Sequence, residues 1–74
     1  MLAMDAVKKV MELRGLRTMD LAGKLNIKSN VLTKRYTQQN VSVEKLNEML
    51  RPMSYKVVIM PETSEIPDGA FTIE

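Results

Sequence analysis

The sequence predicts a mainly α-helical fold, in which a small domain of about four helices is followed by a C-terminal β-strand or hairpin. Three observations lead to this expectation. Apolar residues recur at helical spacing over residues 3–14. Residues 18–37 show the pattern of two short helices joined by a tight turn. Residues 55–60 are rich in β-branched side chains and end at Pro61, which is typical of a strand.

The chain of 74 residues is long enough for one small domain with a modest core. It contains no Cys and no His, so we expect no disulfide, no metal site and no cofactor. The carboxylates are scattered over solvated helices, and this arrangement does not predict an enzyme. Because no long apolar run and no signal-peptide pattern is present, we expect a cytoplasmic protein without a membrane segment.

Charge is distributed unevenly along the chain, although the formal net charge is only +2. All 11 Lys and Arg residues lie within residues 1–60, whereas residues 61–74 carry four acids and no base. Between residues 14 and 35, six basic residues accompany a single acid, Asp20. Clustered positive charge is the electrostatic footprint of nucleic-acid binding. A lysine-rich solvated surface is the alternative explanation.

The first helix is expected over residues 3–14. Its apolar stripe consists of Ala3, Ala6, Val7, Val10 and Leu13. Gly15 is expected to end the helix in the left-handed conformation, with Leu16 folded back on Met11. We interpret this helix as a brace for the core and assign no chemistry to it.

The next two helices are expected over residues 18–25 and from residue 29 to about residue 36. The Thr18 hydroxyl is expected to cap the first of them. Asn26 tolerates the left-handed conformation that ends this helix, and Ile27 then turns toward the core. The link is so short that the two helices must cross at a steep angle, which makes them a helix-turn-helix unit.

The second helix of this unit is polar or basic on one side. Val31 and Leu32 are its expected apolar anchors, with Tyr36 one turn further on. Four polar residues share the other face, and they are Ser29, Asn30, Thr33 and Lys34. Such a face is either a plain solvated surface or a surface that contacts a ligand.

The apolar residues of this unit fall at positions that define a known motif. They are Leu21, Ala22, Leu25, Ile27 and Leu32. With them, residues 21–36 (LAGKLNIKSNVLTKRY) resemble the helix-turn-helix of the Cro and phage-repressor type, also called XRE-like. Asn26 stands where this family usually has Gly, Lys28 where an N-capping Ser or Thr is common, and Arg35 where an apolar residue is usual. The resemblance covers about residues 3–50 and implies a lambda-repressor-like fold.

A fourth helix is expected from Val43 to Leu50, with Ser42 as its N-cap. Its apolar face consists of Val43, Leu46, Met49 and Leu50. Arg51 and Pro52 are expected to end this helix.

The resemblance implies that the helix over about residues 29–37 lies in the major groove of double-stranded DNA. The base-reading residues are expected to be Ser29, Asn30, Thr33 and Lys34. Among them, the Asn30 amide suits adenine and Lys34 can donate to guanine. Phosphate contacts are expected from Arg17, Thr18, Lys28, Arg35, Thr37, Gln38, Gln39 and Asn40.

Residues 54–74 are expected to form a C-terminal element that follows a helix-turn-helix domain over residues 1–53. A strand over 55–60 needs a partner for its backbone groups. One candidate is the segment 71–73, reached through a turn at Pro67-Asp68-Gly69, and the other is the same strand of a second copy. Cro-like proteins dimerise through a C-terminal strand, so the resemblance favours the second copy. Dimer contacts are expected from Tyr55, Val57, Val58, Ile59 and Met60. A partly disordered acidic tail is the alternative.

Together these observations predict a small homodimeric transcriptional regulator that binds double-stranded DNA in a sequence-specific manner. The resemblance implies a repressor of the phage or mobile-element kind, located in the bacterial cytoplasm with the nucleoid. A protein-interaction module is the alternative function. An antitoxin or adaptor of the same fold uses its acidic tail and exposed strand to bind a protein partner.

Overall fold

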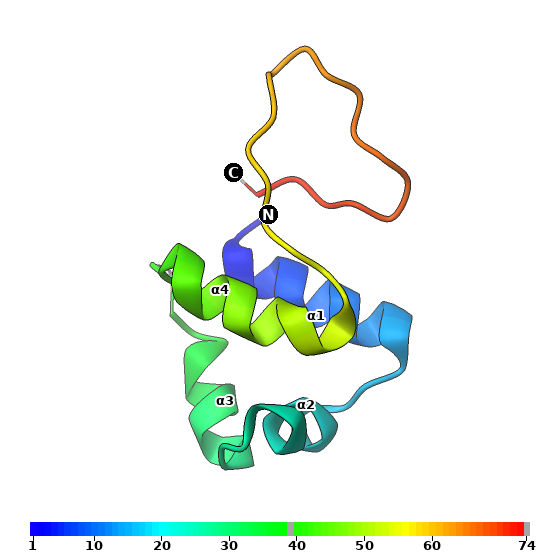
Figure 1. The fold of residues 1–74 in the computed structure, drawn as a ribbon. Helices are drawn as coiled ribbons and strands as arrows, with labels where there is room; N and C mark the ends of the chain where they lie inside the picture. The colour runs from blue at the N-terminus through cyan, green and yellow to red at the C-terminus, as the bar shows by residue number, and fades with distance from the viewer. Residues whose placement is uncertain (39, 74) are drawn as a thin grey trace.

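The computed structural model describes residues 1–38 and 40–73. It contains four α-helices and a short 3-10 helix: α1 (Ala3–Arg14), α2 (Thr18–Leu25), α3 (Ser29–Arg35), α4 (Val43–Leu50) and η1 (Arg51–Met53). Helices α1 and α4 lie side by side, and α2 and α3 form the opposite end of the helical part (Figure 1). The predicted mainly helical class is confirmed, with the four helices at the expected places.

The core forms where the apolar faces of all four helices meet. Its buried members are Met4, Val7, Val10, Met11, Leu21, Ala22, Leu32, Leu46, Met49, Leu50 and Met53. Three residues expected in the core are instead exposed, Leu13 by 62%, Val43 by 61% and Val31 by 38%. The buried stripe of α1 consists of Met4, Ala6, Val7, Val10 and Met11, and Leu13 lies outside this stripe. Val43 occupies the first turn of α4, which extends past the buried cluster.

The helix ends follow the expected left-handed caps. Gly15 has φ +67° and Asn26 has φ +58°, and both close their helices as predicted. After each cap, the next residue donates its N–H back to the last turn: Leu16 to Met11 O at 2.9 Å and Ile27 to Ala22 O at 3.0 Å. This pattern is the Schellman motif, which satisfies the last free carbonyls of a helix.

The cap predicted for the start of α2 is wrong. The N-cap residue is Arg17, and its N–H donates to the Asp20 carboxylate at 2.9 Å. An acidic side chain at the third helical position can reach back in this way to the backbone of the cap residue. The Thr18 hydroxyl instead lies 2.9 Å from the Tyr36 hydroxyl, so it joins α2 to α3. The predicted Ser42 cap is confirmed, because its Oγ accepts from Lys45 N at 3.1 Å.

The strand predicted over residues 55–60 is not seen, and in the described residues the whole tail is irregular. Tyr55 and Val57 pack against the core, and the Val57 N–H donates to Asn47 Oδ1 at 2.9 Å. Ile59 is fully exposed. A β-strand needs a neighbouring strand whose backbone groups form hydrogen bonds with its own. Within one chain, this segment instead forms a hydrogen bond with a side chain of α4.

The chain nevertheless turns back at the predicted place. Ala70 N donates to Pro67 O at 3.1 Å, and Gly69 has φ +84°, which only Gly adopts without strain. The returning segment is held by side chains: the Tyr55 hydroxyl donates to Gly69 O at 2.8 Å, and the Tyr55 ring stacks on Phe71 with centroids 6.5 Å apart. The tail projects away from the helices on the side opposite α2 and α3 (Figure 1), which gives the molecule extents of 39 × 24 × 17 Å.

Candidate nucleic-acid interface

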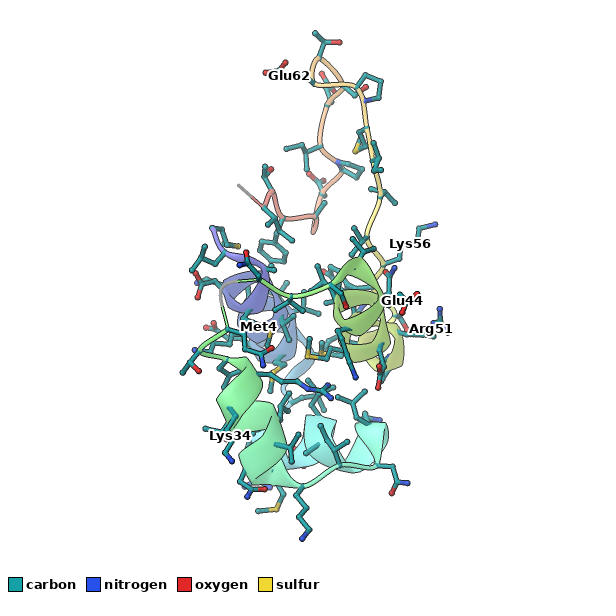
Figure 2. All side chains as sticks on the ribbon, turned by 90° about the vertical axis from the view of Figure 1, so that its left-hand side faces the viewer. Met4, Lys34, Glu44, Arg51, Lys56 and Glu62 are labelled. Carbon is teal, nitrogen blue, oxygen red and sulfur yellow. The ribbon has the colours of Figure 1, made fainter. Side chains whose placement is uncertain are left out.

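The helix α3 turns one side to the core and the other to solvent. Leu32 is fully buried, and the helical period therefore directs Asn30 and Lys34 to the opposite side. Thr33 and Val31 are also exposed and flank these two residues. We call these four residues, Asn30, Val31, Thr33 and Lys34, the outer face of α3. Figure 2 shows Lys34 on the outer side of the helix, far from the tail.

Three of the four predicted base-reading residues share this outer face. Asn30 and Lys34 are exposed one helical turn apart. Thr33 is exposed too, but its hydroxyl donates to Ser29 O at 3.0 Å, so its proton is used within the helix. Ser29, the fourth, is half-buried at the start of α3. Sequence reasoning placed Val31 in the core, whereas its side chain is 38% exposed.

The residues predicted to contact phosphates differ in their exposure to solvent. Lys28, Gln38 and Asn40 are exposed near the two ends of α3. Thr37 is exposed as well, with its hydroxyl donating to Lys34 O at 2.9 Å. Gln39 lies outside the described residues. Lys28 is the N-cap residue of α3, so its exposed side chain lies at the N-terminal end of that helix.

Two of the predicted phosphate contacts are turned inward. The Thr18 hydroxyl is engaged with Tyr36, and Thr18 is half-buried. Arg35 is half-buried, and its Nη1 is shielded from solvent without a hydrogen-bond partner in the described residues. That nitrogen does not face a phosphate outside the molecule.

Arg17 is exposed at the start of α2, where it meets the one acid of the basic segment. Its Nε lies 3.5 Å from Asp20 Oδ2, and Asp20 also accepts from the Arg17 backbone N–H. This backbone hydrogen bond lowers the pKa of Asp20, and the charges of Arg17 and Lys24 act in the same direction. Asp20 therefore stays ionised and neutralises part of the Arg17 charge.

A polar junction centred on Tyr36 fixes the angle between the helices of the unit. The Tyr36 hydroxyl donates to Met11 Sδ at 3.4 Å and lies 2.9 Å from Thr18 Oγ1. Since a phenol has one proton, Thr18 donates to Tyr36 in this chain of contacts. Lys8 Nζ lies 4.9 Å from the centroid of the Tyr36 ring. Residues of α1 and α2 thus meet at the side chain that directly follows α3, which the sequence indicated only as an apolar anchor.

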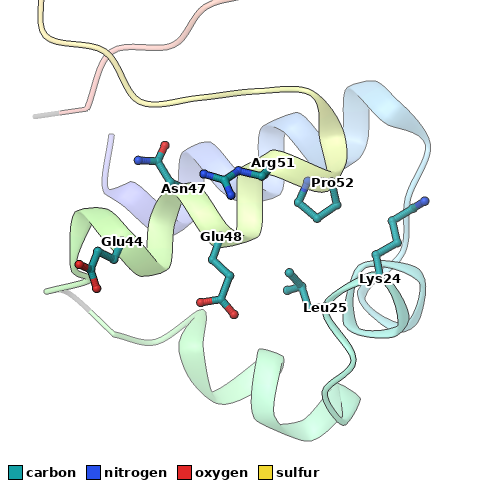
Figure 3. Close-up of a pocket in the computed structure, with 7 residues that line it drawn as sticks. All are labelled: Lys24, Leu25, Glu44, Asn47, Glu48, Arg51 and Pro52. Atoms are coloured by element: carbon teal, nitrogen blue, oxygen red, sulfur yellow. The ribbon is translucent and has the colours of Figure 1, made fainter.

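A shallow groove of about 560 Å³ lies between α2 and α4 (Figure 3). Its lining consists of Lys24, Leu25, Glu44, Asn47, Glu48, Arg51 and Pro52. The lining contains two acidic and two basic side chains, so the groove has no single charge that selects a ligand. In the described part of the chain, no group of three or more Asp, Glu, His or Cys residues is placed to hold a metal ion.

None of the helices in residues 1–38 and 40–73 is long and apolar enough to cross a membrane. Comparison with protein-family models, curated proteins and solved structures finds no match. The assignment of a function therefore depends on the residues and geometry of the chain itself, above all on the outer face of α3.

Proposed function

We propose that this protein binds double-stranded DNA in a sequence-specific manner and acts as a small homodimeric transcriptional regulator of the phage or mobile-element kind. The observation that carries the proposal is the outer face of α3. This face is exposed, short and largely polar, and it belongs to a helix that a tight turn joins to α2. An α-helix fits the major groove, which is about 12 Å wide.

The chemistry of the face suits base edges. The Asn30 amide offers a donor and an acceptor, which is the pattern that pairs with adenine, and Lys34 can donate to guanine. Lys28 at the start of α3 and Arg17 at the start of α2 are the proposed cations for phosphate contacts. Phosphate contacts orient the helix, and the exposed side chains of α3 then select the sequence.

Dimerisation is proposed to use the extended segment 55–60. Its last three residues, Val58, Ile59 and Met60, are all exposed apolar side chains. Pairing this segment with the same segment of a second copy supplies hydrogen-bond partners for its backbone N–H and C=O groups. The pairing also covers part of this apolar surface. The tail lies on the side of the helices opposite α2 and α3 (Figure 1), so both copies keep α3 open. Two such helices read half-sites about 34 Å apart.

A salt titration tests DNA binding itself. The affinity of the wild-type chain for duplex DNA should fall with salt, with a log–log slope of about −0.9 for each phosphate contact. Lys28→Ala should make the slope shallower by about one, because one contact is lost. Lys9→Ala, which removes an exposed lysine of α1, is the matched control and should leave the slope unchanged. A flat salt response of the wild type rules out the proposal.

A second function is favoured by Ile66, a further exposed apolar residue that lies among the four acids of residues 61–74, together with the exposed Val58 and Ile59. These residues suit a protein-interaction module, such as an antitoxin or adaptor, that binds a protein partner through the tail. The two functions predict different masses for the purified protein in solution. A regulator of the proposed kind has twice the chain mass of 8.4 kDa, whereas an adaptor awaiting its partner has the chain mass alone.

A further inference from the structure

The exposed position of Val31 has a consequence for the sequence that α3 reads. Leu32 alone carries the fully buried contact of α3 with the core, while the neighbouring Val31 is 38% exposed. Asn30 and Lys34 lie on the side of the helix opposite Leu32. Val31 flanks this pair on one side and Thr33 flanks it on the other. The outer face of α3 is therefore polar along its centre and apolar on one flank.

The two flanks differ in what they can recognise. Thr33 already donates its hydroxyl proton to Ser29 O at 3.0 Å, so it enters the groove without a free donor. Val31 has neither a donor nor an acceptor. An apolar side chain cannot distinguish the polar edges of the bases, but thymine alone among the four bases presents a methyl group in the major groove.

We propose that Val31 is a specificity-determining residue that packs against the 5-methyl group of a thymine. This inference rests on the proposed function, because it requires the outer face of α3 to lie in the major groove. Val31 directly follows Asn30, whose amide suits adenine, so the two residues together favour A·T pairs at neighbouring positions of the half-site. Contact between the valine and the methyl group removes apolar surface of both from water.

The experiment uses a duplex site that the wild-type chain selects from a random DNA pool. Each thymine of that site is replaced in turn by deoxyuridine, which lacks the methyl group and keeps the base-pairing edge. Wild-type affinity should fall roughly fourfold at one thymine of each half-site, the effect of exposing one apolar carbon. Val31→Ala should bind the thymine and deoxyuridine forms of that position equally well.

The control variant is Val43→Ala, which truncates an exposed valine of α4 and should keep the fourfold preference for thymine. Alanine is a strong helix former, so neither variant should lose helix content by circular dichroism. The assignment of Val31 is overturned if Val31→Ala keeps the wild-type preference, or if the selected site has no thymine at which deoxyuridine weakens binding. Failure of the proposed function gives a different result, since no site is then selected and binding does not depend on salt.

Discussion

At the scale of single residues, Tyr36 has the largest role in placing the proposed interface. Its hydroxyl contacts Thr18 of α2 and Met11 of α1, although the sequence indicated only an apolar anchor. Periodicity shows that a side chain faces inward, but it does not show which hydrogen bonds the polar end of that side chain makes. The same limit applies to Val31 and Leu32, because two adjacent apolar residues leave open which of them reaches the core.

Tyr36→Phe should destabilise the protein by about 1 kcal/mol, the usual contribution of a hydrogen bond to a polar group. For a domain of this size the expected fall in melting temperature is about 4–8 °C. Thermal unfolding followed by circular dichroism measures it. Thr18→Val removes the same contact from the other side, so the double variant should lose less than the sum of the two single losses. Additive losses mean that the two hydroxyl groups do not interact.

At the scale of elements, three helix ends were predicted correctly, whereas the cap at the start of α2 was not. Gly15 and Asn26 both adopt the left-handed conformation that their residue types favour, and Ser42 caps α4. These signals are local, so a single sequence contains them. The strand over 55–60 was not predictable in the same way, because β-pairing depends on a partner segment that no local pattern provides.

Two glycine substitutions should change stability in opposite directions. Gly15→Ala should cost about 1–2 kcal/mol, because a side chain in the left-handed region is strained even where nothing lies within 4 Å of the new Cβ. Gly23→Ala lies within α2, also with nothing within 4 Å, and should stabilise by about 0.5–1 kcal/mol. Chemical denaturation of the two variants measures both effects. If Gly15→Ala is neutral or Gly23→Ala destabilises, the described helix boundaries are wrong.

At the scale of the whole molecule, basic and acidic residues lie at opposite ends. The basic residues Lys24, Lys28 and Lys34 lie on the end formed by α2 and α3, and the tail beyond α1 and α4 carries the acids Glu62, Glu65 and Asp68 (Figures 1 and 2). The charge asymmetry was visible in the sequence. Its arrangement at opposite ends was not, because it depends on where the chain returns after α4.

The exposed apolar residues Val58, Ile59 and Met60 predict a dimer that forms through the tail. Val58→Pro should convert the protein to a monomer of 8.4 kDa by light scattering, because proline removes a backbone donor from the pairing segment. Val58→Thr keeps both the N–H and the β-branch, so it should remain dimeric. If Val58→Pro has the same mass as the wild type, the interface lies elsewhere.

The central claim is that the outer face of α3 reads DNA sequence, and its most direct test is the ratio of affinities for a selected site and a scrambled duplex of equal length. Asn30→Ala and Lys34→Ala should each lower this ratio, because each variant loses contacts to base edges. The free-energy difference between the two duplexes should fall by about 1–3 kcal/mol in each case. Lys9→Ala in α1 should keep the wild-type ratio. If Asn30→Ala and Lys34→Ala still prefer the selected site as strongly as the wild type does, the outer face of α3 does not read sequence.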